Sequence, residues 1–217
     1  MALAIFDLDE TLIHGDCASL WSEQMVRLGW VDGESFLRRD KALMDAYGKG
    51  HLAMEDYMAF SLEPLIGRPP EEVEHLVDPW VEDFIEPIIF SDASKTIAAH
   101  RKAGDRILVI SASGTHLVKP IAERLGIDEI LGIELEVERG VYTGKTTGVL
   151  TYREGKITRL LEWLDEQEEN LEGASFYSDS RNDLPLLLKV DYPHVVNPDP
   201  VLREHAENNK WPIHTWK

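Results

Sequence analysis

Two aspartates, Asp7 and Asp9, follow a short apolar run near the start of the chain. In an extended strand, residues i and i+2 point to the same side, so both carboxylates are expected to project together from the strand's carboxyl end. Like charges this close repel each other. They are tolerated if a cation lies between them, if one carboxyl keeps its proton, or if water solvates both in a loop. The pair by itself leaves these three alternatives open.

Later apolar runs also end in polar side chains. Ligands of open parallel sheets bind at the carboxyl ends of the strands, so polar side chains that end separate strands are expected to meet in space. Carboxylates, a hydroxyl, backbone amides and one lysine suit a phosphoryl group and a divalent metal. Besides the aspartate pair, the candidates are Ser111, Lys156, Asp179, Asn182 and Asp183.

The elements that must position these residues follow from the alternation of short apolar runs with helical patterns. This alternation predicts an α/β fold with a Rossmann-like parallel-sheet core flanked by helices. Strands are expected at 2–7, 106–111, 175–179 and 194–197, and helices near 93–103, 115–125, 156–169 and 199–208.

The first two predicted strands are separated by far more residues than one crossover helix needs. Residues 14–87 hold several amphipathic stretches and no convincing strand, which predicts an inserted α-helical cap domain of about four helices. The α/β core would then comprise residues 1–13 and 88–217. A second excursion, 134–152, alternates apolar and polar residues around glycines and predicts a small β-hairpin flap.

The composition restricts the classes of partner. The chain has 217 residues, of which 43% are hydrophobic, enough for a substantial core. Its formal net charge of -18 argues against nucleic acid and anionic membranes as partners. No basic segment or signal sequence opens the chain, and no apolar stretch approaches the roughly 20 residues of a membrane span, so a cytoplasmic protein is expected. Cys17 is the only cysteine, which excludes an intrachain disulfide.

Four motifs in order resemble those of the haloacid dehalogenase superfamily. D-L-D-E-T at 7–11 is similar to its first motif, I-S-A-S-G at 110–114 to its second, Lys156 to its third, and D-S-R-N-D at 179–183 to its fourth. The helical insertion resembles the type 1 cap of the phosphoserine-phosphatase-like subgroup. The chain departs from the D-G-x-N-D and S-G-G patterns common in that subgroup, which puts phosphoserine in doubt as the substrate.

The resemblance implies a phosphatase that works through an aspartyl-phosphate. Asp7 would be the nucleophile and Asp9 the general acid and base. Mg²⁺ would be held by Asp7, by Asp179 and by the backbone carbonyl of Asp9. Asp183 would orient the metal shell. The paired carboxylates would then hold the metal and divide the chemistry between them.

The resemblance also implies residues that hold the phosphate and the rest of the substrate. Ser111, with backbone amides near Ala112 and Ser113, and Lys156 would hold phosphate oxygens. Contacts with the remainder of the substrate are expected from Asp16, the acidic residue that follows the first motif, and from Asn182.

An acid at position 16 suggests that the substrate is a small phosphorylated metabolite with a positive group, such as phosphoserine, histidinol phosphate, phosphocholine or phosphoethanolamine. Two other classes of function remain open. One is a phosphotransferase or mutase on the same scaffold, and the other is a non-enzymatic metal-binding or phosphoacceptor module. A calcium loop fits poorly, because Leu12 stands where that loop needs glycine and Ala18 where it needs glutamate. The oligomeric state has no signature in the sequence.

Overall fold

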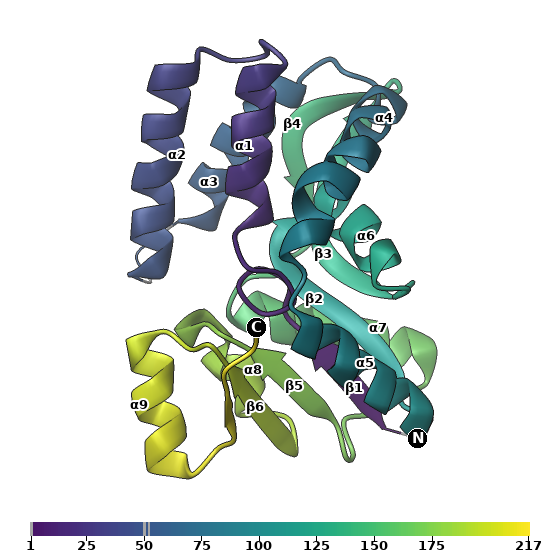
Figure 1. The fold of residues 1–217 in the computed structure, drawn as a ribbon. Coiled ribbons are helices and arrows are strands. Elements are labelled where there is room, and N and C mark those ends of the chain that lie inside the picture. The colour runs from purple at the N-terminus through teal and green to yellow at the C-terminus, as the bar shows by residue number, and fades with distance from the viewer. Residues whose placement is uncertain (1, 50, 52) are drawn as a thin grey trace.

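The core of the protein is a seven-stranded sheet, seen in a computed structural model that describes residues 2–49, 51 and 53–217 (Figure 1). The strand order is β4-β3-β2-β1-β5-β6-β7. Every neighbouring pair is parallel except β3 and β4, which are antiparallel. The strands are β1 (Leu3–Phe6), β2 (Arg106–Gly114), β3 (Ile130–Glu138), β4 (Val141–Thr147), β5 (Ser175–Ser178), β6 (Tyr192–Val196) and β7 (Ile213–His214).

Helices cover both faces of this sheet, so the central strands are buried on both sides. Along β1, Ala4 and Phe6 face one hydrophobic cluster, whereas Leu3 and Ile5 face the other. The first cluster includes residues of α5 (Ser91–Ala103) and α6 (Thr115–Arg124), and the second includes residues of α7 (Glu154–Gln167), α8 (Leu184–Leu187) and α9 (Pro200–Asn209). The predicted parallel-sheet core with flanking helices is confirmed.

The segment between β1 and α5 is helical in its described part. Figure 1 shows its four α-helices gathered at one end of the molecule beside β4. They are α1 (Cys17–Arg27), α2 (Gly33–Gly48), α3 (Met54–Leu62) and α4 (Pro70–Trp80), with shorter turns at Glu63–Leu65, Val81–Ile85 and Glu86–Ile88. Trp21 and Trp80 are buried here and pack edge to face at 5.1 Å. Met1, Gly50 and Leu52, which fall within the predicted domains, lie outside the described residues.

The chain enters and leaves this helical segment through two stretches that lie side by side. His14 donates its backbone N–H to Ile88, and Phe90 donates to Leu12, at 2.8 and 3.0 Å. The helical segment and the sheet are therefore joined by a narrow double connection.

The β3–β4 hairpin, which lies where the flap was predicted, also contacts the helical segment. Tyr142 in β4 accepts a backbone hydrogen bond from Gly67 and donates one to Arg68, both at 2.9 Å. Gly144 lies against Ile66, so close that an added Cβ would be 2.6 Å from Ile66 Cγ1. The hairpin thus fastens one edge of the sheet to the loop before α4.

The structure differs from the sequence expectations at the end of one strand and by one additional strand. The second strand was predicted to end at Ser111 but continues to Gly114, because its register with β3 shifts between Ile110 and Gly114 and allows Gly114 to pair with Ile133. The short strand β7 was not predicted. No helix in the described part of the chain is long and apolar enough to cross a membrane.

Candidate active site

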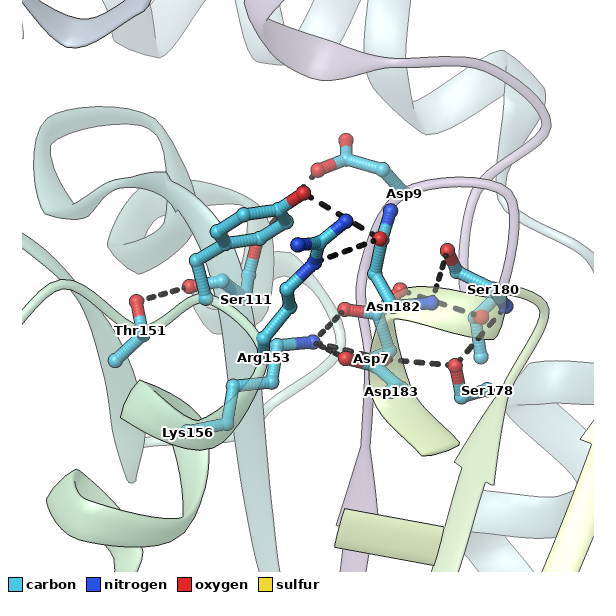
Figure 2. A network of polar contacts seen from close by, with 12 residues as sticks. Asp7, Asp9, Ser111, Thr151, Arg153, Lys156, Ser178, Ser180, Asn182 and Asp183 are labelled. Atoms are coloured by element: carbon cyan, nitrogen blue, oxygen red, sulfur yellow. Dashed lines mark hydrogen bonds and ion pairs between the residues drawn. The ribbon is translucent and has the colours of Figure 1, made fainter. Parts of the chain in front are cut away.

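A buried lysine lies between two aspartates at the carboxyl end of the sheet. Nζ of Lys156, in the first turn of α7, lies 2.7 Å from Oδ1 of Asp7 and 2.8 Å from the carboxylate of Asp183 (Figure 2). Lys156 is only 2% exposed. Ser178, at the end of β5, donates its hydroxyl to Asp183 at 2.7 Å. Three of the predicted site residues therefore form one buried ion-pair network.

A fourth predicted residue, Asp179, joins this network through a threonine. The hydroxyl of Thr11 lies 3.2 Å from Oδ1 of Asp179 and 3.4 Å from Oδ2 of Asp7. Thr11 is fully buried, and it is the last residue of the D-L-D-E-T motif, so the motif itself signalled a role that the sequence analysis left out.

Asp9 is held by groups from two different elements. Its Oδ1 accepts the backbone N–H of Cys17, the first residue of α1, at 2.7 Å. Its Oδ2 accepts the Ser113 hydroxyl at 2.8 Å, and the Ser111 hydroxyl lies 3.5 Å away. Both serines belong to β2, so Asp9 links the start of the helical segment to the central sheet. The role of the Ser113 hydroxyl was not anticipated from the sequence.

The predicted phosphate-binding segment lies in a strand, and α6 begins only at Thr115. The Ser113 amide donates to the Ser111 hydroxyl at 3.1 Å. The Ser111 carbonyl accepts the Thr151 hydroxyl at 2.5 Å. Ala112 and Ser113 line a cavity beside the aspartates of this site.

Burial and charge repulsion shape the titration of the carboxyl groups. Burial raises the pKa of Asp7 to about 7, even though Lys156 acts in the opposite direction. Burial, followed by the charges of Asp7 and Asp183, raises the pKa of Asp179 well above its ordinary value. Burial by itself favours the neutral amine of Lys156, but the charges of Asp183 and Asp7 outweigh it and raise the pKa of that lysine.

The charge balance and ligand chemistry of this site suit a hard divalent cation. Asp7 and Asp183 share a single buried lysine, and Asp179 adjoins them through Thr11, so the site holds more acids than bases. Carboxylate and carbonyl oxygens are the ligands that Mg²⁺ takes, commonly with only one or two protein carboxylates. Asp7 and Asp179 supply two such carboxylates. In the described residues, no three His, Cys, Asp or Glu side chains form a complete metal-binding group, so the remaining ligands would come from backbone, water and substrate.

A cavity of about 280 Å³ opens above these groups, between the sheet and the helical segment. Its floor holds Asp7, Asp9 and Asp179. The opposite side is formed by helices α1 to α3 and by the residue that precedes α1. The side chains that line it are Asp16, Ala18, Met44, Tyr47, Met54 and Tyr57.

Asp16, the predicted substrate residue, lies in this cavity wall and also caps α1. Its carboxylate accepts the Ser19 backbone N–H at 2.7 Å. Burial, with the nearby charge of Asp9, raises the pKa of Asp16 to about 8. A second buried acid, Asp40, accepts the hydroxyls of Ser19 and Ser22, each at 3.0 Å, and so holds α1 against α2.

Asn182 does not line the cavity and instead connects three segments at its edge. Its side-chain oxygen lies 3.2 Å from Nε of Arg153 and 3.4 Å from the Tyr152 hydroxyl. Its amide donates to the Tyr47 carbonyl, at the end of α2, at 3.4 Å. Neither Tyr47 nor Tyr152 was anticipated from the sequence.

The sequence is similar to known hydrolases along most of its length. A sequence profile of the haloacid dehalogenase-like hydrolases matches residues 4–188. A protein named histidinol-phosphatase from Neisseria meningitidis serogroup C is 37% identical over 219 residues, which cover 99% of each chain.

Solved structures share the fold. A protein of unknown function from Bordetella pertussis Tohama I matches with a TM-score of 0.92 and 33% identity, covering 99% of this chain and 98% of the other. A phosphoserine phosphatase that holds an analogue of a phospho-aspartyl intermediate matches with a TM-score of 0.71 and 24% identity, covering 100% of this chain and 93% of the other. At that identity, the second likeness speaks for the fold alone.

Proposed function

The chain belongs to the haloacid dehalogenase-like hydrolase family, and from this premise we propose that it hydrolyses a small phosphomonoester through an aspartyl-phosphate on Asp7. The observation that carries the proposal is the position of Asp7. One of its oxygens is held by Lys156 at 2.7 Å, and its carboxylate lines the cavity beside Asp9 and Asp179. Such a nucleophile splits one difficult hydrolysis into two easier displacements.

In the first step an oxygen of Asp7 attacks phosphorus. The new O–P bond forms as the bond from phosphorus to the leaving-group oxygen breaks, and protonated Asp9 gives its proton to that oxygen. The Cys17 amide and the Ser113 hydroxyl, at 2.7 and 2.8 Å, hold the Asp9 carboxylate in place for the transfer.

In the second step a water molecule attacks the same phosphorus and loses a proton to Asp9. The O–P bond to Asp7 breaks, which releases inorganic phosphate and restores both carboxyl groups. Lys156 stays beside Asp7 throughout, where its positive charge offsets the negative charge of nucleophile and phosphate.

Mg²⁺ is proposed as the cofactor. Asp7, Asp179 and the backbone carbonyl of Asp9 would hold it, and Asp183 would act at one remove by fixing Lys156. When bound, the cation neutralises charge on the transferring phosphoryl group.

The substrate is proposed to carry a positive group and no carboxylate. Asp16 supplies an acid at the far side of the cavity, among methionine and tyrosine side chains that suit a short alkyl chain or a ring. Among the described residues that line the cavity, none is lysine or arginine, so a substrate carboxylate would meet acids and no base. These features favour histidinol phosphate and phosphorylated amino alcohols over phosphoserine, and the relative named histidinol-phosphatase agrees with that order.

The domain division of the sequence analysis is also proposed: a cap at 14–87 on a core of 1–13 and 88–217. The paired crossings at His14 with Ile88 and at Phe90 with Leu12 support boundaries at these positions. A cap above the cavity would exclude bulk water and large substrates such as phosphoproteins from the site.

The test is phosphate release from a panel of histidinol phosphate, phosphoethanolamine, phosphocholine, phosphoserine and a neutral alkyl phosphate, with Mg²⁺ or with EDTA. We expect magnesium-dependent turnover that falls by about 10³-fold or more in Asp7→Asn. Asp92→Asn, a surface aspartate on α5, is the matched control and is expected to match the parent. Equal activity of Asp7→Asn and the control would refute the proposed nucleophile.

A further inference from the structure

A second, much smaller cavity lies behind the wall of the active-site cavity. Its volume is about 20 Å³, room for a single water molecule. Ala18, Tyr57 and Ser113 line both cavities. Trp21 of α1 and His116 of α6 line only the small one. Helices from the helical segment and from the core therefore meet around it.

Three polar atoms of the residues around this cavity are buried without a partner. They are Nε1 of Trp21, the hydroxyl oxygen of Tyr57 and Nδ1 of His116, none of which has a hydrogen bond to the described residues. Trp21 is 2% exposed and Tyr57 is 4% exposed. A buried polar atom left unpaired costs about 1–3 kcal/mol, so three at one cavity call for a common partner.

Gly114 leaves room for the histidine nitrogen at the cavity. A Cβ built on Gly114, itself a lining residue, would be 2.6 Å from Nδ1 of His116. Burial lowers the pKa of His116 to about 4, so the ring is neutral near pH 7. A neutral ring with its proton on Nε2 presents Nδ1 as an acceptor.

We propose that one water molecule occupies this cavity and fixes the Tyr57 hydroxyl as a hydrogen-bond acceptor for the substrate. The indole N–H of Trp21 can only donate, and Nδ1 of the neutral His116 accepts. The water accepts from Trp21 and from the Tyr57 O–H, and donates to His116. Tyr57 has a single proton, so only its lone pairs remain for the active-site cavity.

This arrangement assigns Tyr57 a part in substrate choice, a point that rests on the proposed function. Tyr57 and Asp16 line the same cavity, so an ammonium or imidazolium N–H placed between them would donate to both. A quaternary ammonium has no N–H to donate. The water and Tyr57 should therefore favour phosphoethanolamine over phosphocholine.

The water itself is tested by crystal structures of the parent, Trp21→Phe and Trp80→Phe. Trp80→Phe is the matched control, because Trp80 belongs to the same aromatic cluster and does not line the small cavity. We expect one water within hydrogen-bond distance of the three atoms in the parent and in Trp80→Phe, and its loss in Trp21→Phe. A dry parent cavity, or one closed by a rotated side chain, would overturn the proposal.

The role of Tyr57 is tested by the KM of phosphoethanolamine and phosphocholine in Tyr57→Phe. We expect the KM of phosphoethanolamine to rise about five-fold, the loss of roughly one hydrogen bond, with kcat and the KM of phosphocholine changed less. Trp21→Phe should raise the KM of phosphoethanolamine in the parent but add little in the Tyr57→Phe background. Equal rises for both substrates, or additive effects of the two variants, would overturn the acceptor role. A water seen in a parent that hydrolyses neither ester would support the water site and refute the proposed function.

Discussion

Nζ of Lys156 donates to Oδ1 of Asp7 over 2.7 Å, although 149 positions separate the two residues in the chain. The contact is buried and joins the first turn of α7 to the end of β1. It places a cation beside a buried carboxylate, where the proposed phosphoryl transfer takes place. We expect both folding and the proposed chemistry to depend on this pair.

Lys156→Met is expected to lower the free energy of unfolding by about 3–5 kcal/mol near pH 8, because it leaves Asp7 and Asp183 buried without a cation. The loss should be smaller at pH 5, where Asp7, whose pKa is raised by burial, can take up a proton. Urea unfolding of the parent and the variant at pH 8 and at pH 5 measures the loss of unfolding free energy at each pH. Lys95→Met, at an exposed ion pair with Asp92, is the control and should leave the midpoint unchanged. An unchanged Lys156→Met would mean that the ion pair contributes nothing to stability.

Magnesium is expected to raise the melting temperature more at pH 8 than at pH 5. The folded pKa of Asp7 is about 7, above its ordinary value, so the metal-free folded state binds more protons than the unfolded state across roughly pH 4 to 7. The stability that protonated Asp7 contributes is full below pH 4 and is lost as the pH rises through that window. A cation replaces the proton at high pH and restores stability by roughly 5–10 °C when it exceeds its Kd about 100-fold.

The control for this shift is Asp179→Asn, which removes one proposed ligand. Differential scanning fluorimetry of the parent and Asp179→Asn, with Mg²⁺ or EDTA, gives the comparison. The shift at pH 8 should shrink or vanish in the variant. A shift of the same size in both proteins would place the cation elsewhere.

The KM for a substrate with an ammonium group should fall as the pH rises from about 7 to about 8.5. The pKa of Asp16 in the empty enzyme is about 8, so below that pH the carboxyl is mostly neutral and pairs poorly with a cation. The KM should change by close to ten-fold per pH unit well below the pKa of Asp16, and it should level off above that pKa. Asp16→Asn should flatten the profile for phosphoethanolamine. A neutral alkyl phosphate, whose KM should lack this dependence, separates Asp16 from Asp7.

Gly144→Ala is expected to destabilise the protein more than Gly140→Ala. Both glycines lie in the β3–β4 hairpin with positive φ, +81° and +82°, so each alanine pays about 1–2 kcal/mol of backbone strain. A Cβ at Gly140 meets nothing within 4 Å, whereas one at Gly144 would be 2.6 Å from Ile66. The difference between the two urea midpoints therefore measures the contact between hairpin and helical segment. Equal midpoints would show that Ile66 moves aside at no cost.

Local patterns predicted the elements that carry the central side chains. The short apolar run at 2–7 predicted the first strand. Parallel topology then predicted that Asp7, the polar residue at its end, lies at the carboxyl edge of the sheet. The same logic brought Asp7 and Asp179 to one cavity from strands far apart in the sequence. The signals that predicted helices near residues 93–103 and 199–208 were equally local.

Features that depend on tertiary pairing escaped the sequence analysis. The two residues of β7 are a strand only because Ile213 pairs with Val195. The side of the cavity formed by α1 to α3 was not predicted, since Tyr47 and Tyr57 line it through the packing of helices against each other. Asn182 was expected to contact substrate from its motif, and the structure ties it to Tyr47 and Arg153, a choice made by neighbours from distant segments.

The two backbone bonds of Tyr142 to Gly67 and Arg68 also limit how the cavity can open. If the helical segment swings away from the sheet about the crossings at His14 and Phe90, the hairpin must travel with it or lose both bonds. Because β3 continues into the central sheet beside β2, a travelling hairpin would have to bend β3 near the end of its pairing with β2, around Ile133. Such an opening would couple the bending of one sheet edge to the rotation of the helices above it.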